Sequence, residues 1–248
     1  MEIIEHHDNG KVRSRATMVD GKLHGEVLSY DEAEQLTHRA SYGAGFLEGE
    51  SITYVDGRPV EKATFKEGVL HGETVTYDDA GRVAQRMTFV RGTLHGESLI
   101  HLEGVLRSRL TFAKGKQTGP FSAYDEDGNE VIRSVYKNGK LEGPTLWLAA
   151  SGKLLRRSAY RDNKLYGEVI EYHPSGAVRE KGMYKDGKRE GEFVTYFEDG
   201  SIQMRAFYKA GKLRGEAIEY DLKGNVKPPP GENKTLLSKI ASKLGGGG

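Results

Sequence analysis

Apolar and polar residues alternate along this chain in short runs, and glycine, aspartate or proline separates one run from the next. Between Gly167 and Gly191, for example, Glu168–Tyr172 and Ala177–Tyr184 flank the turn sequence His-Pro-Ser-Gly. Alternation with a period of two points successive side chains to opposite faces of a β-strand. Runs of this kind, bounded by turn residues, are typical of β-hairpins rather than helices.

One phrase recurs along the chain: an aromatic residue, a short turn, and then Gly-x-Leu-x-Gly-Glu. Its second glycine, called the anchor glycine here, repeats every 23 or 24 residues, at Gly25, Gly49, Gly72, Gly96, Gly119, Gly143, Gly167, Gly191 and Gly215. A period in this range predicts an array of stacked units, each in contact only with its neighbours. Counting back from Gly25 adds a half-repeat, whose first strand is predicted to be Glu2 to His6.

The predicted fold class is therefore all-β: an elongated array of β-hairpins that forms an antiparallel meander in a single twisted sheet. The strand after each anchor glycine carries an aliphatic residue and then a tyrosine two positions later, as in Ile170 and Tyr172. The second strand of the hairpin begins with an aliphatic residue and ends with an aromatic one, as in Val178 and Tyr184. Residues of equal parity share a side of a strand, so the pattern predicts one apolar and aromatic face.

A cation occupies the same second-strand position in every repeat. These ladder cations are Arg15, Arg39, Lys62, Arg86, Arg109, Arg133, Arg157, Lys181 and Arg205. Their parity differs from that of Val178 and Tyr184, which predicts that they lie opposite the apolar face. Counting along the hairpin places Lys181 across from Val169 and Thr195, so no systematic pairing with acids is expected.

Two interpretations of the ladder cations remain open. Long basic side chains protect an exposed sheet face against aggregation and cover neighbouring apolar atoms. A row of unpaired cations also fits an anionic partner, in which case reversing Arg109, Arg133 and Arg157 to glutamate weakens binding without unfolding the chain. The ladder cations are the predicted partner-binding residues.

Trp147 is the single tryptophan, and its parity places it on the opposite face from Leu146. An exposed indole is a candidate interface anchor, and Trp147 is therefore added to the predicted partner-binding residues. Equally, its ring fits as cover for a gap beside Leu148.

The composition excludes several classes of function. The 248 residues include 37 Lys plus Arg and 36 Asp plus Glu, a net charge of +1, so the whole chain has no strong attraction to nucleic acid. Cysteine is absent, which excludes disulfides, thiolate metal sites and cysteine nucleophiles. No segment approaches the roughly 18 apolar residues of a membrane span, and the first ten residues do not resemble a signal peptide. A soluble, cytoplasmic protein is expected.

No catalytic or metal site is predicted. His24, His71 and His95 each precede an anchor glycine, so members one repeat apart are separated by two strands, or roughly 10 Å. A zinc ion needs its ligand atoms about 2 Å away, which such a row cannot provide. The sequence predicts no enzyme, no cofactor and no small-molecule substrate.

The segments from Tyr184 to Gly191 and from Tyr208 to Gly215, each followed by glutamate, resemble the bacterial MORN-type repeat (membrane occupation and recognition nexus). The resemblance is to the variant found in YwqK-like antitoxin-component proteins, and it covers the chain to about residue 226. It implies an elongated meander of hairpins. Pro120 and Pro144 depart from the motif at the glutamate, and Asn163 replaces a turn glycine, which asparagine permits because it tolerates positive φ.

The composition changes after the array, which spans residues 1–226 as a half-repeat and about nine repeats. Residues 227–232 are a proline-rich linker that cannot continue a sheet. Residues 233–248 are predicted to form a short amphipathic helix and a glycine tail. So short a helix is not stable alone and is expected to dock on a surface. Its docking stripe consists of Leu236, Leu237, Ile240 and Leu244.

Two hypotheses for function follow from the pattern and the resemblance. The first is a non-enzymatic scaffold that binds a protein partner, a toxin or effector, in the manner of an antitoxin or immunity protein. The second is a peripheral membrane scaffold that binds anionic lipid through the ladder cations and the C-terminal helix. Each exposed cation contributes about 1 kcal/mol near such a surface.

Overall fold

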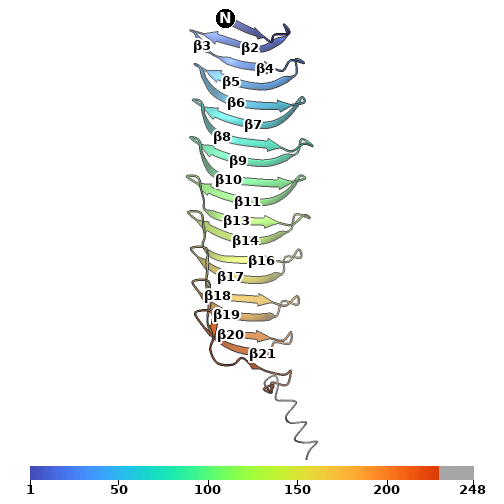
Figure 1. The fold of residues 1–248 in the computed structure, drawn as a ribbon, viewed down its shortest axis with the longest axis vertical. Coiled ribbons are helices and arrows are strands. Elements are labelled where there is room, and N and C mark those ends of the chain that lie inside the picture. The colour runs from blue at the N-terminus through green and yellow to red at the C-terminus, as the bar shows by residue number, and fades with distance from the viewer. Residues whose placement is uncertain (229–248) are drawn as a thin grey trace, which may run out of the picture. The chain divides into compact units, whose positions relative to one another are not determined.

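The structure is a computed structural model that describes residues 1–228. It divides into two compact units, Met1–Gly152 and a unit that begins at Lys153. Within each unit the strands follow one another in chain order, and their pairings are antiparallel (Figure 1). The predicted all-β meander of hairpins is confirmed. The predicted C-terminal helix, with Leu236, Leu237, Ile240 and Leu244, lies outside the described residues.

The strands of the first unit alternate between the first and second strands of successive hairpins. They are β1 (Glu2–His6), β2 (Val12–Val19), β3 (Lys22–Leu23), β4 (Gly25–Tyr30), β5 (Leu36–Gly43), β6 (Phe46–Val55), β7 (Arg58–Lys66), β8 (Val69–Tyr77), β9 (Val83–Val90), β10 (Thr93–Leu102), β11 (Val105–Ala113), β12 (Lys116–Gln117), β13 (Gly119–Tyr124), β14 (Glu130–Lys137), β15 (Lys140–Leu141) and β16 (Gly143–Leu148). Strand β1 has the bounds that the period of the anchor glycines predicts.

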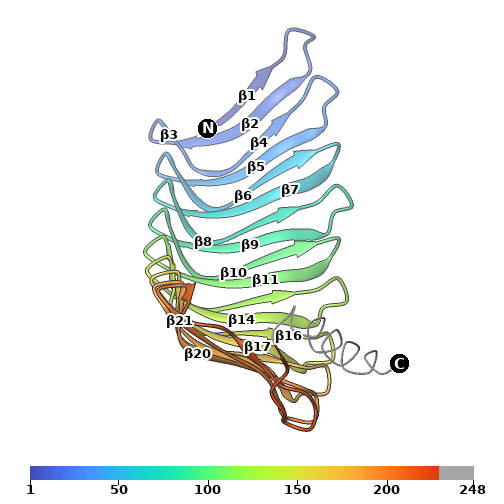
Figure 2. The same cartoon turned by 60° about the horizontal axis from the view of Figure 1, so that its bottom comes forward.

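The second unit repeats the same order on a smaller scale. Its strands are β17 (Leu154–Arg161), β18 (Lys164–Tyr172), β19 (Val178–Lys185), β20 (Lys188–Tyr196), β21 (Ile202–Lys209), β22 (Lys212–Leu213) and β23 (Ile218–Glu219). Figures 1 and 2 show one layer of strands in each unit, with no second layer of described residues over either face.

Tight turns with positive φ at both central residues join each second strand to the first strand of the next repeat. Asp20 and Gly21 have φ of 50° and 74°, and Asp162 and Asn163 have φ of 49° and 67°. This is the type I′ geometry that matches the twist of a hairpin. Asn163 therefore preserves the turn, as predicted. The turn glycine also donates its amide to the preceding repeat, as from Gly92 N to Leu70 O at 2.7 Å.

Substitution of Gly92 by alanine is expected to cost more than substitution of Gly57. Both residues have φ of +72°, where a Cβ costs about 1–2 kcal/mol. An added Cβ at Gly92 would also stand 3.2 Å from Val69 Cγ1, whereas nothing lies within 4 Å at Gly57. Urea unfolding of the two variants measures the difference. Equal losses would contradict the packing of Val69 over the turn of the next repeat.

Several turns inside the hairpins, such as those that begin at Asp78 and Asp125, are held by an aspartate carboxylate. The Asp78 carboxylate accepts the amide of Arg82 at 2.9 Å, and the Asp125 carboxylate accepts the amide of Asn129 at 2.8 Å. These backbone hydrogen bonds favour the charged form and are the first cause that lowers the pKa of both carboxyls below the ordinary 3.8.

A lowered pKa in the folded state makes these turns sensitive to acid. Each charged aspartate stabilises the folded chain at pH values above 3.8, its ordinary pKa. This stabilisation is lost as the pH falls through the lowered pKa of the folded state. The double variant Asp78→Asn, Asp125→Asn is expected to melt below the wild type at neutral pH, with the gap closing below pH 3.8. Melting curves between neutral and acid pH measure this gap, and a gap that does not change with pH would refute the assignment.

The most buried side chains of both units lie on one face of the sheet, called the core face. Directly opposed residues of antiparallel strands share a face. Ala40, 1% exposed, lies opposite Val27 and Ser51, and Ser158, 1% exposed, lies opposite Val169. Second strands end on this face in an aromatic ring, in Tyr42, Phe65, Phe89, Phe112 and Tyr136 of the first unit and Tyr160, Tyr184 and Tyr208 of the second.

Candidate functional site

The ladder cations lie on the opposite face, called the cation face, together with the aliphatic residues and tyrosines of the first strands. The prediction that they face away from these apolar residues is wrong. Lys181 lies directly opposite Ile170 and Val194, not Val169 and Thr195. A β-bulge explains the error: Glu171 pairs with Glu180, but the next residue, Tyr172, pairs with Val178. The extra residue interrupts the alternation along this second strand, and the same shift occurs in hairpins such as β4 with β5 and β20 with β21.

Cations and aliphatic residues therefore alternate across the cation face, strand by strand. In the first unit the row is Ile4, Arg15, Leu28, Arg39, Ile52, Lys62, Val75, Arg86, Leu99, Arg109, Ser122, Arg133 and Leu146, and in the second it is Arg157, Ile170, Lys181, Val194, Arg205 and Ile218. Val75 and Val194 are only 4% and 5% exposed although no second layer covers them. A ladder cation lies directly opposite each of these valines on both neighbouring strands, and the apolar stems of such side chains cover adjacent apolar surface.

Most ladder cations are also neutralised, contrary to the expectation from the sequence. Each pairs with the glutamate that follows the anchor glycine of its own hairpin. The pairs are Arg39 with Glu26 at 3.7 Å, Lys62 with Glu50 at 2.5 Å, Arg86 with Glu73 at 2.9 Å, Arg109 with Glu97 at 3.4 Å and Arg205 with Glu192 at 3.0 Å. The side chains are about half exposed, so each pair is worth about 0–1 kcal/mol.

The other four ladder cations, Arg15, Arg133, Arg157 and Lys181, make no such pair within residues 1–228. Proline replaces the glutamate in the hairpin of Arg133, which pairs with Glu130 instead, and this hydrogen bond lowers the pKa of Glu130. Lys181 lies 5.6 Å from the ring centre of Tyr196, and a hydrogen bond to this tyrosine raises the pKa of Lys181. Within residues 1–228, Arg15 and Arg157 make no ion pair.

The stem of a ladder cation is expected to matter more than its charge. Arg86→Ala removes the methylene groups of a residue directly opposite Val75 and is expected to cost about 1 kcal/mol, whereas Arg86→Met is expected to stay within about 0.5 kcal/mol of the wild type. Denaturant unfolding distinguishes the two variants. If Arg86→Met loses as much as Arg86→Ala, the charge and its pair with Glu73 are responsible instead.

Trp147 lies on the core face, opposite Ile132 of β14, and is half-buried. Its placement on the face opposite Leu146 is confirmed, but it is not the exposed indole that the sequence suggested. The structure thus brings the ladder cations together on one face and places Trp147 on the other.

The core face of the second unit holds a cluster that the sequence analysis missed. Arg189 donates to Tyr208 Oη at 3.2 Å, and its guanidinium lies 4.6 Å from the ring centre of Phe193. Phe193 in turn packs edge-to-face against Tyr184 and Tyr208 at 5.4 and 5.2 Å. The sequence does contain one sign of this cluster, because Arg189 occupies a position where most other repeats have leucine.

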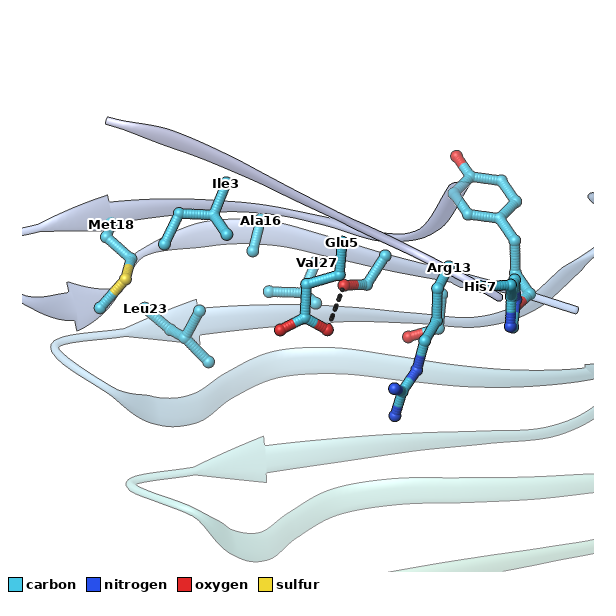
Figure 3. A pocket seen from close by; sticks show the side chains of 11 residues that line it. Ile3, Glu5, His7, Arg13, Ala16, Met18, Leu23 and Val27 are labelled. Atoms are coloured by element: carbon cyan, nitrogen blue, oxygen red, sulfur yellow. Dashed lines mark hydrogen bonds between the residues drawn. The ribbon is translucent and has the colours of Figure 1, made fainter. Parts of the chain in front are cut away.

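A hollow of about 540 Å³ opens on the core face of the first repeats. Figure 3 shows Ile3, Ala16, Met18 and Leu23 toward one end and His7 and Arg13 toward the other. Between them the Ser14 hydroxyl donates to the Glu5 carboxylate at 3.1 Å. Met18 stands where later second strands end in tyrosine or phenylalanine, so this repeat lacks a ring that the others have.

No helix among residues 1–228 is long and apolar enough to cross a membrane. The same residues contain no group of three or more histidine, cysteine, aspartate or glutamate side chains that could hold a metal ion.

Comparison with known families identifies the repeat. Residues 165–186 and 189–210 match the family model described as MORN repeat variant, so the chain contains repeats of this type in β18 to β21. No curated protein matches the chain.

Solved structures that match the chain include a porin-like protein from Bacteroides uniformis ATCC 8492. It is 13% identical, with 82% of this chain and 88% of that chain covered and a TM-score of 0.20. Two others are TcdB2–TccC3, at 12% identity and a TM-score of 0.21, and TcdB2–TccC3–Cdc42, at 12% and 0.19. These cover 92% and 91% of this chain but only 15% of each of those chains. At such TM-scores the similarities carry no information about function.

Proposed function

We propose that this chain is a non-enzymatic scaffold that binds a protein partner through its core face. The observation that supports this proposal is the column of aromatic rings on that face, which no second layer of described residues covers in either unit (Figures 1 and 2). A sheet in an ordinary domain buries its apolar face against a second layer. Here a column of half-buried rings, from Tyr42 to Tyr136 in the first unit, has none among the described residues. Apolar surface of this kind marks an interaction site.

The finer form of the proposal is an antitoxin-like or immunity-like role, with a toxin or effector as partner. It is supported by the resemblance of the repeats to those of YwqK-like proteins. The competing membrane hypothesis relied on free ladder cations and on the C-terminal helix, which lies outside the described residues. Because most of the ladder cations already pair with glutamate, they have less to gain at an anionic lipid surface, which favours the protein-binding proposal.

Two variants of equal charge change test which face binds. The core-face variant is Thr53→Arg, Glu61→Arg, and the cation-face variant is Thr17→Arg, Glu97→Arg. All four residues are exposed residues of the first unit, and Thr53 lies directly opposite Glu61. Proteins captured from the host by the tagged wild-type chain are compared with those captured by each variant, by quantitative mass spectrometry.

The proposal predicts a protein that the wild type and the cation-face variant retain and that the core-face variant loses by about tenfold, a change of 1.4 kcal/mol. Melting temperatures confirm that both variants are folded. Loss with the cation-face variant alone would refute the core-face proposal. Sedimentation of the wild type with anionic vesicles, and no captured protein, would support the membrane hypothesis instead.

A further inference from the structure

Basic residues oppose each other across the tight turns at one edge of the second unit. The opposed pairs are Arg161 with Lys164, Lys185 with Lys188, and Lys209 with Lys212. Like charges at directly opposed positions destabilise a hairpin. In the first unit Lys137 and Lys140 repeat this arrangement, but the five turns before them do not: the opposed residues there are Val19 with Lys22, Gly43 with Phe46, Lys66 with Val69, Val90 with Thr93 and Ala113 with Lys116. Stability therefore does not explain the pattern.

Packing does not require the charge either. The stem of Lys188 covers the turn glycine of the next repeat, with its Cβ 3.6 Å from where a Cβ of Gly211 would stand. Phe46 covers Gly68 in the same way at 3.6 Å. An uncharged side chain thus fills this position equally well. Packing therefore does not explain why a lysine, with its ammonium group, stands there.

These lysines also differ from most of the ladder cations, because they have no acidic partner among the described residues. The lysine edge is defined as Lys164, Lys185, Lys188, Lys209 and Lys212. All of them are exposed, and none makes an ion pair within residues 1–228. Arg161 is excluded because its guanidinium lies 3.7 Å from the ring centre of Tyr166. Neighbouring repeats place equivalent lysines about 10 Å apart, two strands at about 4.8 Å each.

The lysine edge surrounds a recess and adjoins exposed apolar residues. The recess has a volume of about 460 Å³ and is lined by Lys164, Lys185, Asp186, Lys188, Glu190, Lys209 and Ala210. Glu190 is already engaged, because its carboxylate accepts the amide of Ala210 at 2.7 Å. Two residues before Lys185 and Lys209 stand Met183 and Phe207, which are 48% and 54% exposed.

We propose that the lysine edge binds an acidic segment of a protein, with its carboxylates at the lysines and an apolar side chain against Phe207. A chain segment fits better than a membrane plane, because Asp162 and Asp186 occupy the tips of the turns and would meet a flat anionic surface first. A segment can place its carboxylates between these tips. Exposed aromatic residues beside charges are common interface anchors. This inference rests on the proposed protein-binding function and names a second surface for it.

The test uses the full chain and a labelled peptide of repeated Glu-Glu-Leu, with a Gln-Gln-Leu peptide as control. The edge variant is Lys185→Glu, Lys188→Glu, Lys209→Glu. The matched variant is Lys22→Glu, Lys66→Glu, Lys116→Glu, which makes the same charge change at exposed turn positions of the first unit. Fluorescence anisotropy measures each affinity, and melting curves confirm folding. The variant Phe207→Ser tests the apolar contact without any change of charge.

The edge variant is expected to bind the acidic peptide at least about tenfold more weakly than the matched variant, and added salt is expected to weaken wild-type binding. Phe207→Ser is expected to weaken it about threefold or more. Equal weakening by both triple variants, equal binding of the Gln-Gln-Leu peptide, or binding to phosphatidylserine vesicles without peptide binding would each overturn the inference. This test is independent of the capture experiment for the core face, because the core-face variant leaves every lysine of the edge unchanged. Failure of one proposal can therefore be distinguished from failure of the other.

Discussion

Replacement of Phe193 by alanine is expected to lower the free energy of unfolding by about 3–5 kcal/mol. Phe193 is 2% exposed and packs between the rings of Tyr184 and Tyr208 on the core face. Its ring lies over Gly182, which has no side chain to fill the space left by the ring. The truncation therefore creates a cavity that neighbouring groups cannot close. Denaturant unfolding of the intact chain measures the loss.

Phe207→Ala is the matched control. Phe207 lies on the adjacent strand, but on the cation face and 54% exposed, and its loss is expected to cost less than about 1 kcal/mol. Similar losses for Phe193→Ala and Phe207→Ala would contradict the assignment of the two faces in the second unit.

Gly182→Ala is expected to lower the free energy of unfolding by about 1–3 kcal/mol. A comparison with the other repeats would not suggest this loss. The equivalent residue is alanine or serine in most other repeats, as in Ala40 and Ser158. At Gly182, however, an added Cβ would stand 2.4 Å from Phe193 Cδ1, well inside contact distance. Glycine thus stands opposite a large ring here, where the hairpin of Ala40, for example, has alanine opposite the smaller Val27.

A double-mutant cycle tests this pairing. In Gly182→Ala, Phe193→Val the smaller side chain makes room for the added Cβ, so the double variant is expected to lose less than the sum of the two single losses. Strictly additive losses would show that the clash does not determine the cost at Gly182.

The period and the turn chemistry were enough to predict the array. Repeated glycines fix where each strand begins and ends, which is why the bounds of β1 could be predicted as Glu2 to His6. Asparagine at Asn163 adopts φ of 67°, as expected for a residue that tolerates this conformation. These features depend on local backbone preferences, which a single sequence expresses directly.

The faces of the sheet could not be predicted by counting alone. Strict alternation holds only between bulges, and each hairpin has a register shift near its end, as between Thr195 and Tyr196. One extra residue inverts the parity of everything beyond it. The error moved the ladder cations to the wrong face and concealed their pairing with glutamates such as Glu73 and Glu192. The bulge forms where the strand meets its turn, and no residue type in the motif identifies it.

The candidate surfaces were visible in the sequence but could not be interpreted there. The lysines of the turns are as evident as the ladder cations, since Lys185 and Lys188 flank an Asp-Gly turn. Only the structure distinguishes them, because Arg86 has an acidic partner, whereas Lys185 and Lys188 have none within residues 1–228. Ion pairing depends on which side chains share a face, and therefore on the register of the strands.

Site-specific photo-crosslinking in the host tests the central claim, that a protein partner binds the core face. A crosslinking amino acid is placed at Thr53 or at Glu50, two exposed positions of β6 on the core face and the cation face respectively. A crosslinked protein is expected from Thr53 and none from Glu50. The same product from Glu50 alone, or no crosslinked protein from either position, would contradict the claim.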